Sequence, residues 1–294
     1  MTILPSQHWA HERSSLWRRL TRGARRLRQA PDWTDFVGAD WAERIMAEEV
    51  TDRLFRKQGR SIARWTLRAA DGRQLTVYLK RHYRLAWWRG VMATLLAQRA
   101  WSPGLQEWEH LQWAAGQGLP APRAVAAGEF IGPWGGLQSF LAIEELSGML
   151  ALHEAIPLAQ KHLDSLAFSR WKQALAVEMA RMTRALHGQR FFHKDLYVCH
   201  FFIHERDTHH LPDSWEGRVA IIDFHRLARH RWTAPWWKVK DLAELLYSSE
   251  IPGATARDRL AYWHAYGAGR GSFGRLLAWC VRLKWRLYRR HNRK

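Results

Sequence analysis

The sequence is poor in cysteine and has no long apolar run. Its two cysteines, Cys199 and Cys280, form neither a recognisable zinc pattern nor a disulfide framework, which favours a reducing compartment. No stretch approaches the roughly 18 uncharged apolar residues that a membrane-spanning helix needs. Early residues include the charged Glu12 and Arg13 and form no apolar core, so we expect no secretory signal. We therefore expect a cytoplasmic protein, either soluble or peripheral on a membrane.

Acidic residues are scarce beside basic ones. The chain has 27 Asp and Glu against 46 Lys and Arg, a formal net charge of +19. This charge implies an anionic partner: nucleic acid, an anionic membrane surface or a phosphorylated substrate. Tryptophan is abundant, with 19 residues, many of them beside Arg or Lys as in Trp87-Trp88-Arg89. Such pairs suit an interface between apolar and polar media, but core packing explains them as well.

Hydrophobic periodicity divides the chain into a β-rich first half and an α-rich second half. An Asp-Gly pair predicts a hairpin between two of the strands. Strands are predicted over 61–68, 74–81 and 137–145, and helices over 105–116, 165–188, 236–249 and 256–268. This order predicts an α+β fold with two lobes.

Two basic amphipathic helices are predicted near the ends of the chain, over 14–29 and 273–291. Each could lie on an anionic membrane or be a solvated surface helix. The predicted organisation is a basic helical extension over 1–45, an N-terminal lobe over 46–146, and a C-terminal lobe over 147–294 that ends in the second basic helix.

Two acids accompany short apolar runs in the second half. Asp195 lies just before the run 196–203, and Asp223 lies near the end of the run 218–224. Paired as a hairpin, the runs would present both carboxylates at one end. Phosphoryl transfer needs such a pair, because one carboxylate orients and deprotonates the attacking hydroxyl while the other holds Mg²⁺.

These residues resemble the protein-kinase catalytic loop, H-R-D-x-x-x-x-N, and the metal motif D-F-G. The motifs read here as His193-Lys194-Asp195, with His200 at the Asn position, and Asp223-Phe224-His225. The resemblance implies a kinase-like bilobal fold that uses ATP and Mg²⁺, with Asp195 as catalytic base and Asp223 as metal ligand. Mg²⁺ prefers oxygen ligands, so His200 could bind the metal or instead hydrogen-bond Asp195 or a phosphate.

Three motifs together resemble the lipopolysaccharide core heptose kinases, the InaA/WaaP group. They are H-[KR]-D-x-Y-x-C-H-F at 193–201, I-D-x-H-R at 222–226, and K-D-L-A-x-L-x-x-S-S at 240–249. The resemblance implies transfer of the γ-phosphoryl group of ATP to a heptose hydroxyl of the lipopolysaccharide inner core. Its expected partners are that glycolipid and the anionic surface of the inner membrane, on which the protein would be peripheral.

The kinase resemblance extends to the first half with four further residues. Lys80 is expected to bind the α- and β-phosphates of ATP, with Glu107 as its helix partner. Glu109 is two residues further on, so it cannot face Lys80 as well. Gly59 lies between the first strands, although the pattern G-x-G-x-x-G is absent. Glu144 follows a buried strand, at a hinge where the backbone could hydrogen-bond adenine.

Two polar residues are expected to be structural. His193 should orient the loop backbone, and Asp241 should accept hydrogen bonds from it. Other functions stay open: a kinase of this fold acting on another envelope glycolipid or on protein tyrosine, or a pseudokinase, suggested by His200 and the missing glycine loop. Charge and aromatic content alone would permit a nucleic-acid-binding protein, but the acidic pair has no role in that function and no nucleic acid is expected.

Overall fold

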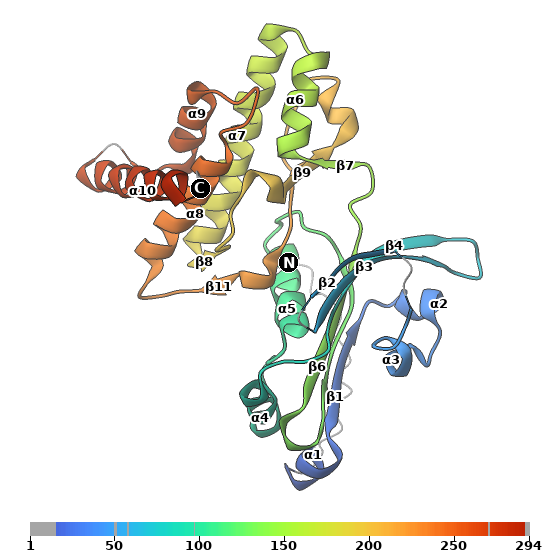
Figure 1. The fold of residues 1–294 in the computed structure, drawn as a ribbon. Helices are drawn as coiled ribbons and strands as arrows, with labels where there is room; N and C mark the ends of the chain where they lie inside the picture. Colours follow the sequence, from blue (N-terminus) through green and yellow to red (C-terminus); the bar gives the residue numbers. More distant parts are fainter. Residues whose placement is uncertain (1–15, 50–51, 58, 97, 270, 292–294) are drawn as a thin grey trace. The chain divides into compact units, whose positions relative to one another are not determined.

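The computed structural model describes residues 16–49, 52–57, 59–96, 98–269 and 271–291 (Figure 1). The chain divides into two compact units. Unit 1 consists of Met1–Gln112 and Arg123–Glu145, and unit 2 of Trp113–Pro122 and Leu146–Lys294. Unit 1 is built on a sheet and unit 2 largely on helices, so the predicted α+β class is confirmed. Among the described residues, none of the helices has both the length and the apolar character needed to cross a bilayer.

Unit 1 contains a six-stranded antiparallel sheet in the order β1-β5-β6-β4-β3-β2. The strands are β1 (Ala24–Gln29), β2 (Asp52–Lys57), β3 (Arg60–Arg68), β4 (Gln74–His82), β5 (Ala124–Ile131) and β6 (Leu137–Glu144). Alternate residues of β4, Leu75, Val77 and Leu79, are buried, as expected for a strand with one face on the core. Trp33 of α2 (Trp33–Val37) and Trp41 of α3 (Trp41–Arg44) join that core. The predicted β3–β4 hairpin is confirmed.

The helix predicted over 14–29 is wrong in its second half. Residues 14 and 15 lie outside the described residues, and α1 (Leu16–Arg22) ends before Gly23, whose φ is +76°. The following residues form β1, which pairs with β5. Helical propensity is weak beside such tertiary contacts: Arg26 binds the fully buried carboxylate of Glu129 on β5.

The helix α5 (Pro103–Gly116) lies directly against the sheet and confirms the helix predicted over 105–116. A Cβ atom at Gly104 would come within 2.4 Å of the Phe140 carbonyl oxygen on β6, so only glycine permits this approach. Glu129 also accepts a hydrogen bond from the Ser102 backbone N–H, at 3.1 Å. These contacts fix the beginning of α5, the helix that carries Glu107.

Unit 2 is a group of helices with two small sheets. Its helices are α6 (Leu152–His162), α7 (Ser165–Gly188), α8 (Ala234–Ser248), α9 (Ala256–Tyr266) and α10 (Ser272–His291). The helices predicted over 165–188, 236–249, 256–268 and 273–291 are thereby confirmed. One sheet contains β7 (Met149–Ala151), β9 (Phe201–His204) and β10 (Ala220–Ile221), and the other contains β8 (Phe191–Phe192) and β11 (Ala228–Arg229).

The two apolar runs that accompany the acids do pair, over a shorter length than predicted. β9 and β10 are antiparallel, with Phe201 opposite Ile221. Before β9 the chain forms a loop and the 3₁₀ turn η2 (Val198–His200). The Ile222 N–H donates to the His200 carbonyl oxygen at 3.0 Å, which continues the pairing. The loops of Asp195 and Asp223 are therefore neighbours.

Candidate active site

Unit 1 contains the predicted pair of Lys80 and Glu107. Lys80 Nζ on β4 lies 2.7 Å from Glu107 Oε1 on α5, and both side chains are largely buried. Glu109 interacts electrostatically with Arg28 instead. Burial raises the pKa of the Glu109 carboxyl group and outweighs the opposing effect of the Arg28 charge. The choice of Glu107 over Glu109 as partner is therefore confirmed, while the role of the pair in nucleotide binding stays a prediction.

The other two residues predicted in unit 1 are engaged locally. Gly59 has φ +74°, and its carbonyl oxygen accepts a hydrogen bond from the Tyr83 N–H at 2.7 Å. The Glu144 carboxylate lies 2.7 Å from Arg123 Nε, and the Glu144 N–H donates to the Arg123 carbonyl oxygen at 2.8 Å. Contacts of either residue with a nucleotide stay predictions, and for Glu144 the backbone N–H is already in use.

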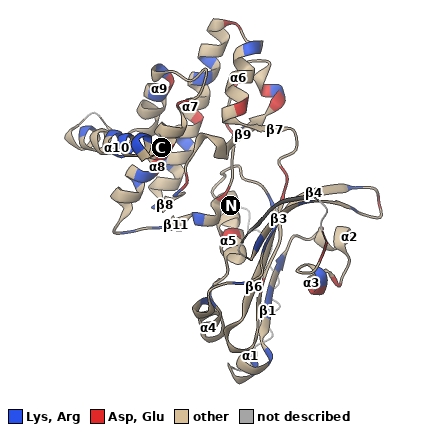
Figure 2. Ribbon diagram, in the orientation of Figure 1, with Lys and Arg blue, Asp and Glu red and all other residues tan. Residues whose placement is uncertain are grey.

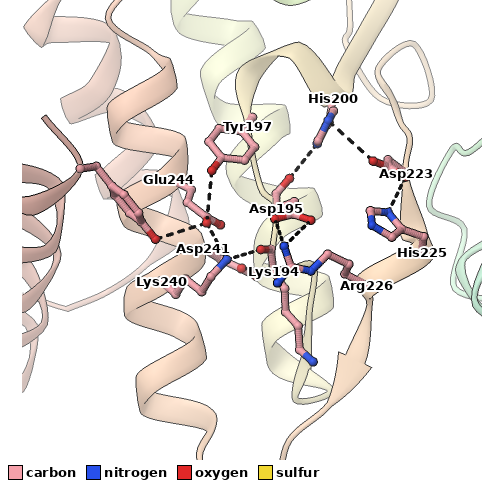
Figure 3. A network of polar contacts seen from close by, with 11 residues as sticks. Lys194, Asp195, Tyr197, His200, Asp223, His225, Arg226, Lys240, Asp241 and Glu244 are labelled. Atoms are coloured by element: carbon pink, nitrogen blue, oxygen red, sulfur yellow. Dashed lines mark hydrogen bonds and ion pairs between the residues drawn. The ribbon is translucent and has the colours of Figure 1, made fainter. Parts of the chain in front are cut away.

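In unit 2 a single buried carboxylate holds the loop that carries Asp195 (Figure 3). Asp241 of α8 is fully buried, and its two oxygens accept the backbone N–H groups of His193 and Lys194, each at 2.8 Å. His187 Nε2 lies 3.2 Å from the same carboxylate. Lys194 has φ +67°, a left-handed conformation that costs a non-glycine residue about 1–2 kcal/mol. The hydrogen bonds to Asp241 offset this cost, and the structural role predicted for Asp241 is confirmed.

His193 fixes the same loop from the other side. Its ring is fully buried, and Nε2 donates to the Ile222 carbonyl oxygen at 2.9 Å. Burial lowers the pKa of His193, because a charged imidazolium would lose its hydration there. The neutral ring thus ties the Asp195 loop to the segment that leads to Asp223, as expected of a residue that orients the backbone.

Arg226 joins the two acid-bearing loops. Its Nη1 lies 2.7 Å and 3.1 Å from the two carboxylate oxygens of Asp195. Dashed lines mark these contacts in Figure 3. Arg226 belongs to η4 (Phe224–Arg226), the 3₁₀ turn directly after Asp223. This charge-assisted contact restricts the orientation of the Asp195 carboxylate. Sequence reasoning included Arg226 in a motif without giving it a role, because nothing in the spacing indicates its partner.

Asp223 lies between two histidines. It has φ +67°, and its Oδ1 lies 2.6 Å from Nδ1 of His225. Its Oδ2 lies 4.0 Å from Nε2 of His200. Nδ1 of His200 is 2.7 Å from the carbonyl oxygen of Asp195, and since a carbonyl only accepts, Nδ1 carries the proton. In the neutral ring, Nε2 then carries no proton, and it lies on the side of Asp223.

The pKa of His200 reflects these neighbours. Burial lowers it, but the Cys199 thiol and the Asp195 carbonyl oxygen, with smaller help from the Asp223 charge, outweigh burial and raise it above its usual value. His200 thus couples the loop of Asp195 to the carboxylate of Asp223.

The donor set fits a magnesium ion that arrives with its nucleotide. In the part of the chain that the structure describes, no three His, Cys, Asp or Glu side chains gather to form a metal site. Mg²⁺ does not require such a cage, because it commonly takes one or two carboxylates and fills its shell with water and phosphate oxygens. Asp223, oriented by His225, fits as such a carboxylate, and His200 Nε2 lies 4.0 Å from its other oxygen.

A layer of polar side chains behind the loop was not predicted. Lys240 Nζ binds the Lys194 carbonyl oxygen and lies 2.5 Å from Glu244 Oε1, and the Tyr197 hydroxyl donates to the same oxygen at 3.4 Å. Burial, with Glu244 nearby, raises the pKa of Tyr197 to about 12, so its hydroxyl keeps its proton. The four-residue spacing of Lys240 and Glu244 on a helix was the available signal, but it could not reveal Tyr197.

Comparisons with known proteins agree on one family. The model of the "Lipopolysaccharide kinase (Kdo/WaaP) family" matches residues 56–266. The lipopolysaccharide core heptose(I) kinase WaaP of Pseudomonas aeruginosa is 31% identical over 237 residues, which cover 78% of this chain and 85% of the relative. WaaP of Escherichia coli is 29% identical over 201 residues, which cover 63% and 70%. A solved structure of WaaP in complex with acyl carrier protein has a TM-score of 0.66 and 26% identity, and covers 90% of this chain and 99% of that one.

Replacing Asp241 by Asn tests the dependence of the loop on this carboxylate. Asparagine would keep one acceptor oxygen but turn its NH2 group towards the N–H of either His193 or Lys194, so the free energy of unfolding should fall by about 2–4 kcal/mol. Denaturant unfolding measures the change. The exposed Asp213→Asn variant is the matched control and should stay within about 0.5 kcal/mol of the parent. Equal stability of the two variants would contradict the assignment.

Proposed function

The chain belongs to the lipopolysaccharide kinase (Kdo/WaaP) family and is a phosphotransferase, and we propose that its acceptor is a heptose hydroxyl of the lipopolysaccharide inner core. The donor is the γ-phosphoryl group of ATP. The observation that carries the proposal is the pair of acids on adjoining loops of unit 2, Asp195 bound by Arg226 and Asp223 framed by His225 and His200. Phosphoryl transfer of the protein-kinase type uses one carboxylate to orient the attacking hydroxyl and another to hold Mg²⁺.

In this proposal Asp195 is the general base. Its carboxylate accepts the hydrogen bond of the acceptor hydroxyl and takes the proton as the new oxygen–phosphorus bond forms. The bond between the γ-phosphorus and its bridging oxygen breaks, and ADP leaves. The contact with Arg226 orients the Asp195 carboxylate before the acceptor arrives.

Asp223 and Lys80 bind the nucleotide in this proposal. Asp223 would hold the Mg²⁺ that accompanies ATP, and the ion would neutralise phosphate charge. His200 Nε2 would contact the metal when the ring is neutral, or donate to a phosphate oxygen when the ring is protonated. Lys80, oriented by Glu107, would contact the α- and β-phosphates. Arg226 and Lys194 add positive charge around Asp195, which suits an anionic acceptor.

We place the protein on the cytoplasmic face of the inner membrane, as a peripheral protein. The proposed acceptor is anchored there by lipid. The helix α10 supports this location because its sequence contains no acid and its outward side exposes large apolar residues at steps of three or four. These residues are Phe273, Leu276, Trp279, Leu283 and Leu287.

We also propose an acyl carrier protein as a partner, since the WaaP relative was solved in complex with one. Unit 2 contains an apolar cavity of about 120 Å³, which could receive an apolar chain. Its lining includes Leu175, Met179, Leu245, Ile251, Tyr262 and Val281.

Gel filtration tests this partner. The purified chain should co-elute with an acyl-loaded carrier protein and less with the unloaded form, because the acyl chain would enter the cavity. Equal co-elution with both forms would show that the cavity does not receive the acyl chain. No co-elution with either form would contradict the proposal that an acyl carrier protein is a partner.

Replacing Asp195 by Asn tests the catalytic assignment. The amide cannot accept the proton, so phosphorylation of dephosphorylated core glycolipid with ATP and Mg²⁺ should slow by about 10²–10⁴-fold. Mass spectrometry of the product identifies the sugar that gains the phosphate. A product on a different glycolipid or on tyrosine would keep the kinase assignment and replace the acceptor. If the variant and the parent were equally active, Asp195 would not be the base.

The pair of Glu107 and Glu109 provides a matched test in unit 1. Glu107→Gln removes the charge bound to Lys80, and hydrogen bonds between charged groups contribute about 1.5–3 kcal/mol, so kcat/KM for ATP should fall about 10–100-fold. Glu109→Gln removes a carboxylate two residues away and should change kcat/KM by less than about threefold. Steady-state kinetics at varied ATP measures both, and similar losses in the two variants would argue against the Lys80 contact.

A further inference from the structure

We propose that one end of unit 1 docks on an anionic lipid bilayer through exposed tryptophans. This tryptophan end consists of α1, α4 (Trp87–Leu95) and the 3₁₀ turn η1 (Pro133–Gly135) between β5 and β6, three elements that pack on one another. Trp17 of α1 and Trp87 of α4 are each 72% exposed, and Trp134 of η1 is 77% exposed. Each of three segments that are remote in sequence thus brings a large aromatic side chain to this end and leaves it in solvent.

Two glycines bring the backbones of α4 and η1 together. A Cβ atom at Gly90 would lie 1.9 Å from the Gly135 carbonyl oxygen, and one at Gly135 would lie 3.3 Å from the Trp87 carbonyl oxygen. Trp134 immediately precedes Gly135, so it and Trp87 are carried by backbone segments in direct contact.

Trp134 also adopts an unfavourable backbone conformation. Its φ of +56° is in the left-handed region, which is uncommon for a bulky residue. A side chain that packs in a core can offset such strain, but this indole is largely exposed. Two backbone hydrogen bonds close the turn around it, from the Gly136 N–H to the Pro133 carbonyl oxygen and from the Gly132 N–H to the Gly136 carbonyl oxygen. The turn thus holds Trp134 in this conformation with its indole in solvent.

The charge of the tryptophan end has one sign. The sequences of α1, α4 and η1 contain no Asp or Glu. Arg18 and Arg22 of α1 are exposed, and Arg89 of α4 is partly exposed with its guanidinium over the Trp88 ring. Figure 2 shows blue and tan segments on α1 and α4 and no red ones. An anionic surface is complementary to this arrangement.

Lipid is the occupant that both features favour. Tryptophan prefers the boundary between headgroups and acyl chains, because its ring is apolar and its N–H is polar. Arginine binds phosphate oxygens, and basic residues near a bilayer bind anionic headgroups. The inference rests on the proposed function only for the choice of membrane, since a lipid-anchored acceptor requires the enzyme to visit one. Binding to vesicles can be tested without any acceptor.

The test is sedimentation with vesicles of phosphatidylcholine, either alone or mixed with phosphatidylglycerol. A variant with Trp17→Ser, Trp87→Ser and Trp134→Gly removes the three exposed rings, and glycine suits the positive φ. Its affinity for mixed vesicles should fall at least about tenfold, because three large apolar side chains no longer enter the bilayer. The matched control is Trp232→Ser in unit 2, which removes a tryptophan that is 95% exposed and should bind as the parent does.

A second variant, Arg18→Gln with Arg22→Gln, tests the charge. Its affinity for mixed vesicles should fall about fivefold per arginine at low salt, with a smaller effect in high salt. Circular dichroism and thermal unfolding verify that each variant is folded.

Three outcomes would overturn the inference. In the first, the triple variant binds mixed vesicles as tightly as the parent. In the second, the triple variant is less stable than the parent but binds vesicles equally well. In the third, the triple variant and the Trp232 control lose the same affinity for vesicles. If the parent chain ignored both kinds of vesicle, docking and the membrane location would fail together. The kinase assay on detergent-dispersed acceptor would still decide the proposed function separately.

Discussion

The buried carboxylate of Asp241 is the interaction on which the site in unit 2 depends. Isolated charge in a protein interior is unfavourable, and Asp241 is stabilised there by two backbone N–H groups and by His187. These contacts make the backbone of the Asp195 loop rigid on the side away from Asp241. His193 and Lys194 have fixed peptide planes, so Asp195 projects from a defined backbone towards Arg226. Three of the described polar contacts of Asp241 thus help to fix the orientation of Asp195.

The histidines distinguish this site from a pair of bare carboxylates. His200 binds the backbone of Asp195 with one nitrogen and faces Asp223 with the other, while His225 holds the opposite oxygen of Asp223. A carboxylate held in this way has little freedom to rotate, which would reduce the entropy lost if it bound a cation as we propose. Part of the environment that a metal ligand requires is therefore built into the chain.

Local patterns allowed much of the fold to be predicted from the sequence. The β3–β4 hairpin has β-prone runs joined by an Asp-Gly turn, and α7 has helical periodicity. β1 could not be predicted in this way, because Arg26 and its partner Glu129 are 103 residues apart. For the site, the family motifs led to Asp195, Asp223 and Glu107. The contact of Arg226 with Asp195 was missed because it depends on the tertiary path of two loops.

The left-handed backbone at Lys194 and Asp223 has a consequence for the range of side chains that either position accepts. Residues branched at Cβ are excluded from this conformation on steric grounds alone, whatever their charge, whereas glycine and asparagine adopt it readily. In a mutational scan, substitutions at these positions would therefore fail for one of two reasons. The new residue is unable to adopt the left-handed backbone, which is a requirement common to both positions, or it lacks the side-chain chemistry that the particular position needs. Asparagine at 223 would keep the left-handed backbone but lose the negative charge. This substitution therefore separates the contribution of the charge from that of the loop conformation.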